Sequence, residues 1–411
     1  MKKWICMMLT FALVLGLCLP VTALSFTDET AIGNLDAVTV MVDLGLISGY
    51  EDGSFLPRNN IRRAEAAKLM ALVRSADPKT AGIVSFSDVP ASFWAAKYVA
   101  FCAEQNIIAG YAGKFRPQDF VTGREFAKML LVCLGYDGGR YTGAGWTANV
   151  DTDAKEQGIY KDYNADPGAN LSRDGACLLM YNAMQCYAVA GVDALGRKTF
   201  VTDQLMNPVT YMEHRFGVVK YAGLLEANEY ADLTKPWSRL ADGMSKLEGH
   251  SPFRVSTPYS FLGRMVEIYT VRTTVDGVSS YKVIGIPHLA DSDRVFTTTD
   301  EDMFLLAQRF SGVSADSATQ YYYNGELSDE TLFGKIGGDC HITAVDRDQD
   351  NRLDAVMVTD FRNGTVIGTD PVTIGSGNLT LPGGFFDAVR PVQSGEIVRC
   401  AAIGGRFLVA D

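Results

Sequence analysis

The chain has 411 residues, of which 47% are hydrophobic, which is enough apolar material for two or three folded domains and excludes a disordered chain. Its formal net charge of −11 excludes a general electrostatic attraction to nucleic acid or to other anionic polymers. An anionic ligand must therefore be captured by a local group of cationic side chains, because the overall field repels it.

The first 23 residues have the order of a secretory signal peptide. Met1-Lys2-Lys3 is basic, residues 5–19 are apolar apart from one threonine, and Val21-Thr22-Ala23 places small residues where a signal peptidase cleaves. We predict cleavage after Ala23, which removes two lysines and takes the formal charge from −11 to −13. Cys18 offers a lipoprotein alternative, but Leu17 is too large for the usual lipobox. No later stretch approaches the roughly 18 apolar residues of a membrane span.

The cysteines of the mature chain do not have the spacing of a disulfide scaffold. They are Cys102, Cys133, Cys177, Cys186, Cys340 and Cys400. None forms a Cys-x-x-Cys pair, and most lie in predicted helices. We therefore predict buried free thiols, although an even count in a secreted chain also permits disulfides.

A repeated pattern organises residues 25 to about 190. Ser25-Phe26-Thr27-Asp28 returns as Ser85-Phe86-Ser87-Asp88, and Leu46-Ile47-Ser48-Gly49-Tyr50 returns as Ile107-Ile108-Ala109-Gly110-Tyr111. In a third copy, Glu156-Gln157-Gly158-Ile159 matches residues 104–107 of the second. A fixed period of this length indicates a repeated supersecondary unit.

The helix that closes each copy has the same apolar spacing, at positions i, i+3, i+4 and i+7. These positions are Ala66, Leu69, Met70 and Val73 in the first copy, Phe126, Met129, Leu130 and Cys133 in the second, and Ala176, Leu179, Met180 and Ala183 in the third. We predict three units of helix, glycine-rich turn and helix, at residues 24–80, 81–138 and 139–190, which together form an all-α region.

These residues resemble the S-layer-homology repeat. Its pattern runs Phe-x-Asp, an aromatic residue, Gly-Ile-x-Gly-Tyr, Asp-Gly-x-Phe-x-Pro, and then Thr-Arg-Ala-Glu at the start of a helix. The resemblance is specific because several separated elements recur in the same order. It implies a three-fold helical prong that binds secondary cell-wall polysaccharide, often through a pyruvylated sugar, in a surface protein of a Gram-positive, clostridial-type bacterium.

The arginine of this motif is the main candidate for binding an anion. A helix N-terminus presents unpaired N–H groups and partial positive charge, and an arginine in the first turn adds a two-pronged donor. Arg63 and Arg173 occupy the motif position, whereas Gly123 stands there in the second copy and Arg124 follows it. One step along a helix rotates a side chain by about 100°. We predict anion sites centred on Arg63 and Arg173, with Arg124 as a displaced third candidate.

Three aromatic residues of the repeats are candidates for stacking on a sugar ring. They are Tyr50, Tyr111 and Trp94. Packing in the core is the alternative interpretation, because aromatic residues at helix starts are often buried.

Other recurring residues are expected to have structural roles. Positive φ in turns explains the glycines Gly49, Gly53, Gly110 and Gly113. Glu65 and Glu125 are expected to bond a helix start or a neighbouring repeat, and Asp28 and Asp88 are expected in turns or caps.

From about residue 191 onward the sequence is rich in short β-type runs that glycine, asparagine and aspartate interrupt. Residues 263–274 and 279–287 flank Val275-Asp276-Gly277, and residues 398–402 and 407–410 flank Gly404-Gly405, which predicts two hairpins. A helix is predicted near residues 300–309. We predict one or two small β-rich domains in residues 191–411, and a multidomain α+β fold for the whole chain.

An acidic run lies between two predicted strands, residues 341–345 and 353–358. Asp346, Asp348, Asp350 and Asp354 stand at positions 1, 3, 5 and 9, the spacing with which a calcium loop directs oxygens inward. Asn351 replaces the turn glycine and Met357 replaces the closing glutamate. The alternative to a Ca²⁺ site is an acidic turn that joins the strands.

Catalytic motifs are absent from the sequence, which contains no His-Glu-x-x-His, no Gly-x-Ser-x-Gly and no Walker loop. His214, His250, His288 and His341 have no metal-ligand spacing. We therefore expect a non-enzymatic, wall-anchored surface protein that binds secondary cell-wall polysaccharide, associates with further copies in a lattice and has no nucleic-acid partner. The alternative is a wall-tethered enzyme, such as a glycan hydrolase, with its catalytic unit in residues 191–411.

Overall fold

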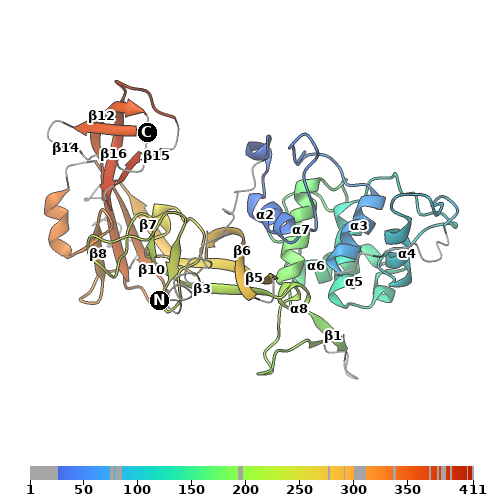
Figure 1. Ribbon diagram of the computed structural model, residues 1–411. Coiled ribbons are helices and arrows are strands. Elements are labelled where there is room, and N and C mark those ends of the chain that lie inside the picture. Colours follow the sequence, from blue (N-terminus) through green and yellow to red (C-terminus); the bar gives the residue numbers. More distant parts are fainter. Residues whose placement is uncertain are drawn as a thin grey trace, which may run out of the picture. The chain divides into compact units, whose positions relative to one another are not determined.

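The computed structural model describes residues 26–74, 78, 86–192, 198–275, 278–290, 292–299, 312–336, 339–369, 372–376, 379–380, 386–388, 391–404 and 406–409. The chain divides into two compact units, Met1–Val218 and Val219–Asp411 (Figure 1). Helices dominate the first unit and strands the second, so the predicted mixture of α and β structure is confirmed. The predicted signal peptide and the predicted helix at residues 300–309 lie outside the described residues.

Three helix pairs form most of the first unit (blue to green in Figure 1). The pairs are α2 (Leu35–Asp43) with α3 (Arg63–Val73), α4 (Ala96–Glu104) with α5 (Gly123–Leu134), and α6 (Trp146–Glu156) with α7 (Arg173–Gln185). Short 3-10 turns, η1 (Glu29–Ala31) and η2 (Gly138–Tyr141), precede the first and third pairs. Every position that the apolar spacing predicted to face the core of α3, α5 and α7 is buried.

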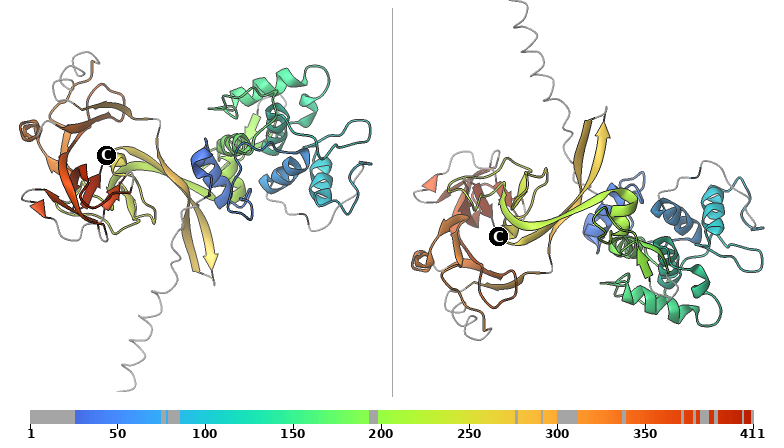
Figure 2. Two further views of the ribbon diagram at one scale, coloured as in Figure 1. Left: turned by 90° about the horizontal axis from the view of Figure 1, so that it is seen from above. Right: turned by 90° about the horizontal axis from the view of Figure 1, so that it is seen from below.

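The three pairs pack in a closed ring. Helix α3 packs against α4, α5 against α6, and α7 against α2, so the second helix of each pair contacts the first helix of the next. Helix α5 also contacts both α3 and α7. Figure 2 shows the helices from two further directions. The contact between α7 and α2, which closes the ring, also includes side-chain hydrogen bonds. Asn34 at the start of α2 donates from its backbone N and its Nδ2 to the Asp174 carboxylate (3.1 and 2.7 Å).

A cycle of three backbone hydrogen bonds lies just before α3, α5 and α7. The N–H of Ile61 donates to the carbonyl of Leu171 (2.8 Å), that of Val121 to Ile61 (3.0 Å), and that of Leu171 to Val121 (2.9 Å). All three side chains are buried. Because each donor belongs to one pair and its acceptor to another, all three pairs are needed to satisfy the cycle.

The glycines of the turns serve two different needs. Gly53 and Gly113 have positive φ (81° and 72°), as predicted. Gly49 and Gly110 do not, and here the prediction was wrong. A Cβ on Gly49 would lie 2.6 Å from the ring of Phe26, and one on Gly110 would lie 2.4 Å from the equivalent Phe86 ring. These two glycines are required because an aromatic ring packs against the backbone.

The first unit continues beyond residue 190, where we expected the third repeat to end. It includes the strands β1 (Val189–Val192) and β2 (Lys198–Phe200), which pair antiparallel, and helix α8 (Tyr211–Phe216). Helix α8 packs against α7, and the hydroxyl of Tyr211 donates to the carbonyl of Val73 at the end of α3 (3.2 Å). This docking explains why the segment belongs to the helical unit.

The second unit contains three sheets. The first has the order β4-β3-β5-β6, the second β7-β10-β11-β8-β9, and the third β14-β13-β12-β16-β17-β15. The strands are β3 (Val218–Asn228), β4 (Ser245–Leu247), β5 (Met265–Val275), β6 (Val278–Leu289), β7 (Arg294–Thr298), β8 (Gln320–Tyr323), β9 (Glu326–Ser328), β10 (Cys340–Asp346), β11 (Ala355–Asp360), β12 (Arg362–Thr369), β13 (Val372–Ser376), β14 (Leu379–Thr380), β15 (Phe386–Ala388), β16 (Ile397–Ile403) and β17 (Arg406–Val409). Two 3-10 turns, η3 (Tyr259–Phe261) and η4 (Glu330–Lys335), connect them.

One hydrophobic core joins the three sheets of the second unit. It contains Leu225 from β3, Ile268 from β5, Tyr322 from β8, Met357 from β11 and Ile403 from β16. This shared core favours a single domain over the two that the sequence also allowed. Both predicted hairpins are confirmed, because β5 pairs antiparallel with β6 and β16 with β17.

The prediction of buried free thiols is confirmed. All six cysteines of the expected mature chain are unpaired and buried. Burial raises the pKa of the Cys133 and Cys186 thiols to about 12. The protonated thiols therefore behave as small apolar core groups.

Leu171→Ala tests the importance of the backbone cycle. Removing this buried side chain should lower the free energy of unfolding of the helical unit by about 2–5 kcal/mol, because it leaves a cavity beside the three hydrogen bonds. Urea unfolding followed by helical circular dichroism measures the change. Leu205→Ala is the matched control, since Leu205 is 80% exposed in the same unit. An equal effect of both changes would contradict a core at this cycle.

Candidate functional site

The starts of α3, α5 and α7 each lie against the loop of another helix pair. At α3 the N–H groups of Arg63 and Ala64 donate to the carbonyls of Asp119 and Pro117 (2.9 and 3.0 Å). The same pattern recurs at the other two starts, where Gly123 and Arg124 bond Ala169 and Pro167, and Arg173 and Asp174 bond Asn59 and Pro57. The unpaired N–H groups that we expected to receive a carboxylate are therefore already occupied, because the ring of pairs closes through them.

Arg63 ties α3 to the loop of the second pair. Its Nε donates to the carbonyl of Phe115 and its Nη2 to that of Ala109, both at 3.0 Å. The guanidinium lies over the Phe115 ring, 4.8 Å from its centre, and the residue is buried. Its Nη1 is 3.6 Å from Oε1 of Glu125 on α5. Two of the five N–H donors of this side chain thus join the repeats through hydrogen bonds.

Arg173 has the same role where α7 meets the loop of the first pair. Its Nε donates to the carbonyl of Phe55 (2.9 Å) and its Nη2 to that of Ser48 (2.8 Å). The guanidinium lies 4.8 Å from the ring centres of both Tyr50 and Phe55. Arg63 and Arg173 are therefore equivalent, buried and bound to backbone carbonyls, which gives both a structural role alongside any contact with ligand.

A tyrosine replaces the motif arginine where α5 meets the loop of the third pair. A Cβ on Gly123 would lie 2.8 Å from the hydroxyl oxygen of Tyr163, so this ring occupies the space that an arginine would need. The displaced Arg124 instead donates from Nε to both carboxylate oxygens of Asp151 on α6 (2.9 and 3.0 Å). The sequence showed the missing arginine, but nothing in it pointed to Tyr163 as the replacement.

A groove of about 620 Å³ lies beside the Arg63 contact, between α5 and the turns that flank it. The polar side chains that line it are Arg74, Gln105, Asn106, Lys128, Tyr136, Asp137 and Thr142, and Ile107, Ile108 and Val132 add apolar surface. Its wall also includes Ala109, whose carbonyl accepts from Arg63. The groove is therefore lined by two cationic side chains, Arg74 and Lys128, and by one carboxylate, Asp137.

Lys128 is the second cationic side chain that lines the groove. It is half-buried on α5, and among the described residues it has neither a hydrogen bond nor an ion pair. Burial lowers the pKa of Lys128, and the positive charge of Arg63 lowers it further, whereas Glu125 opposes both. An anion in the groove would stabilise the charged form of this lysine. Arg74 is already used in part, because its Nη1 donates to the carbonyl of Cys133 (3.1 Å).

The three candidate aromatic residues are accessible. Tyr50 is 42% exposed, Trp94 52% and Tyr111 79%, so a core position is excluded for all three. Trp94 packs against Phe93 with ring centres 5.7 Å apart. None of the three lines the groove beside Lys128, and they offer separate surfaces on the same helical unit.

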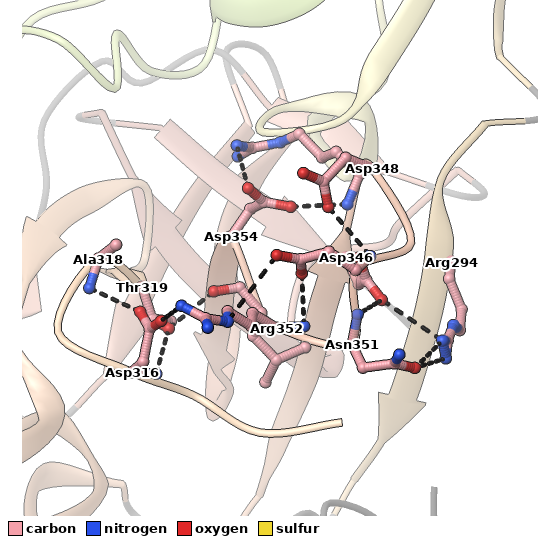
Figure 3. A network of polar contacts seen from close by, with 12 residues as sticks. Arg294, Asp316, Ala318, Thr319, Asp346, Asp348, Asn351, Arg352 and Asp354 are labelled. Carbon is pink, nitrogen blue, oxygen red and sulfur yellow. Dashed lines mark hydrogen bonds and ion pairs between the residues drawn. The ribbon is translucent and has the colours of Figure 1, made fainter. Parts of the chain in front are cut away.

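The acidic loop of the second unit brings together three of its four candidate ligands (Figure 3). Carboxylate oxygens of Asp346, Asp348 and Asp354 lie within 4.8 Å of one another. Asp350 lies outside this group, because its Oδ1 accepts from the backbone N of Arg352 (2.8 Å). Asn351, which stands in place of the turn glycine, has a left-handed conformation with φ of 71°.

Comparisons with known proteins agree with the repeat pattern. Residues 25–67 and 85–127 match the S-layer homology domain, and these segments include α2 and α4 and the first residues of α3 and α5. Over 92 residues the chain is 42% identical to a cellulosome-anchoring protein of Acetivibrio thermocellus, covering 21% of each chain. It is 27% identical over 248 residues to the surface-layer 125 kDa protein of Lysinibacillus sphaericus, covering 57% of this chain and 21% of that one.

A third relative is the S-layer protein EA1 of Bacillus anthracis, which is 31% identical over 135 residues, covering 32% of this chain and 15% of the relative. The chain thus spans about a fifth or less of the length of these three relatives.

These matches confirm that the chain carries S-layer homology domains and is located at the cell surface. The names of the relatives are those of surface and anchoring proteins rather than enzymes, which supports the prediction of a non-enzymatic chain. Within the described residues no helix is both long and apolar enough to cross a membrane.

Arg173→Lys tests the joining role of the motif arginine. A lysine cannot donate in a fork to the carbonyls of Phe55 and Ser48, so we expect a loss of about 1–3 kcal/mol in the free energy of unfolding. Urea unfolding of the helical unit measures it. Arg58→Lys is the control, since Arg58 is exposed in the same loop region. Equal stability of both variants and the wild type would contradict the joining role.

Gly123→Ala tests the packing of Tyr163. Alanine favours a helix over glycine, but the added Cβ meets the tyrosine hydroxyl, so we expect a net loss of about 1 kcal/mol or more. Removing that hydroxyl in Gly123→Ala/Tyr163→Phe should restore part of the stability. Equilibrium unfolding of the single and double variants measures the coupling. An unchanged loss in the double variant would place the strain elsewhere.

Proposed function

We propose that the helical unit anchors the chain to the cell wall by binding a secondary cell-wall polysaccharide that carries carboxylates, such as pyruvylated sugars. We further propose that the third helix pair is a third S-layer homology repeat. Its support is the ring itself, since α6 and α7 supply the contacts that complete the first two pairs.

The observation that carries this proposal is Lys128, which is half-buried in a groove that Arg74 also lines and which has no hydrogen bond or ion pair among the described residues. The chain as a whole is strongly acidic, so a local concentration of cationic groups is the feature that a polyanion requires. A charge-assisted hydrogen bond to a carboxylate contributes about 1.5–3 kcal/mol. Tyr50, Trp94 and Tyr111 offer exposed rings on which sugar faces stack.

For the second unit we propose display at the cell surface, with self-association between copies. Ile367 on β12 and Ile397 on β16 support this, because these neighbouring strands expose apolar side chains (55% and 71%). Apolar side chains that remain exposed on paired strands are suited to contact another protein surface.

Lys128→Gln tests the groove in the full mature chain. The change keeps most of the side-chain volume and removes the charge, so affinity for wall that retains its secondary polymer should fall about tenfold or more, equivalent to about 1.4 kcal/mol. Co-sedimentation with purified wall over a range of protein concentrations measures the affinity. Unchanged circular dichroism would show that the variant folds.

Two controls make this test decisive. Lys155→Gln removes the same charge from an exposed position on α6 that does not line the groove, and it should leave affinity unchanged. Wall stripped of its secondary polymer should not retain the wild type. Equal sedimentation with stripped wall would contradict polysaccharide anchoring. Equal affinities of the two lysine variants would instead move the binding site away from the groove.

A further inference from the structure

The acidic loop between β10 and β11 has a fixed conformation. The two strands pair antiparallel up to Val345 and Ala355, so the loop leaves and returns at the same end of the sheet. Within it, Gln349 and Asn351 both have positive φ (61° and 71°), which reverses the chain within a few residues. The backbone N of Asp350 donates to Asp348, and that of Arg347 to Asp354, so both acceptor side chains are held in place.

This conformation places three carboxylates around one point. The oxygens of Asp346, Asp348 and Asp354 lie within 4.8 Å of one another. Calcium–oxygen distances are about 2.3–2.6 Å, so two oxygens bound to one Ca²⁺ ion lie at most about 5 Å apart. The observed separation therefore suits ligands of a single ion. Without a cation, three carboxylates this close repel one another.

Asp346 provides an independent sign of a missing partner. Its side chain is fully buried, and its Oδ1 has no hydrogen-bond partner among the described residues. Its Oδ2, in contrast, accepts from the backbone N of Asn351 (3.3 Å) and lies 3.5 Å from Nη2 of Arg294. In Figure 3, Arg294 and Asn351 lie on one side of Asp346, and Asp348 and Asp354 lie on the other. A buried carboxylate oxygen without a donor is costly, and a metal ion would satisfy it.

We infer that Asp346, Asp348 and Asp354 form a Ca²⁺ site in the second unit. All three ligands are carboxylates. Hard cations such as Ca²⁺ prefer oxygen ligands, whereas zinc sites typically contain nitrogen and sulfur ligands. Asp348 is exposed, so water can complete the six to eight oxygens that Ca²⁺ takes, whereas Mg²⁺ demands a stricter octahedron.

The charge around the site predicts its affinity. Arg294 lies near Asp346, and Nη1 of Arg347 is 3.8 Å from Asp354, so two cationic groups offset part of the triple negative charge. A dissociation constant on the order of 10⁻⁴–10⁻³ M, as in extracellular calcium modules, is expected. Such a site is filled outside a cell and empty at cytosolic calcium levels.

The ion would brace several segments of the second unit. Arg294 belongs to β7, and the loop also pairs with residues before β8, where Ser314 donates from its N to Asn351 and accepts from Leu353 (3.1 and 3.0 Å). Arg352 reaches the same segment through an ion pair with Asp316 (3.2 Å). Calcium binding should therefore stabilise the unit against unfolding.

The test compares thermal unfolding of the full mature chain in chelator and in 10 mM CaCl₂. At roughly tenfold or more above the expected dissociation constant, calcium should raise the unfolding midpoint of the second unit by about 3 °C or more. Equilibrium dialysis with calcium alone should give one bound ion per chain. Asp348→Asn changes an exposed ligand without disturbing the core, and it should weaken binding about tenfold or more.

Asp350→Asn is the matched control, since it removes the same charge from the same loop but a carboxylate that faces Arg352. It should weaken binding less than about threefold. Absence of bound calcium in the wild type would overturn the site. Equal stabilisation by 10 mM MgCl₂ would overturn the assignment to calcium, and equal effects of the two variants would overturn the set of three ligands.

Discussion

The helical unit depends on one constraint, which is that the backbone groups before each second helix bond to a different helix pair. Ile61, Val121 and Leu171 satisfy one another in a cycle, and the first N–H groups of α3, α5 and α7 extend the same exchange. In a single pair these groups would lose their protein partners and bond to water instead, because the other pairs both bury and bond them. The fold of each repeat is therefore a property of the three together.

This constraint changes the meaning of the motif arginine. Arg63 and Arg173 each donate to two carbonyls of a neighbouring loop. The presence of this arginine in a repeat therefore indicates first how that repeat is joined to the next. Where Gly123 replaces the arginine, Tyr163 fills the space and the joint persists. On the surface that these contacts leave exposed, Lys128 stands out because it has neither a hydrogen bond nor an ion pair within the described part of the chain.

Periodicity in the sequence predicted the parts of this molecule that depend on local order. The apolar spacing of α3, α5 and α7 gave their buried faces, and the turn residues gave both hairpins of the second unit. It could not show that helix starts were occupied by distant carbonyls, since Arg173 and Asn59 are far apart in the chain. The sequence also gave no sign that Lys128 was a candidate binding residue, because a lysine on a helix is usually solvated. Of the four aspartates in the acidic spacing, Asp346, Asp348 and Asp354 lie together, whereas the carboxylate of Asp350 bonds to the backbone of Arg352.

The buried thiols have a consequence for how such a chain reaches its working place. A protein that crosses a membrane unfolded exposes every cysteine to whatever oxidants lie outside, and a wrong disulfide formed then would block the helical core around Cys102 and Cys133. Once folded, the raised pKa of these groups leaves almost no thiolate for exchange. The thiols are therefore protected only from the point at which the helices have folded around them.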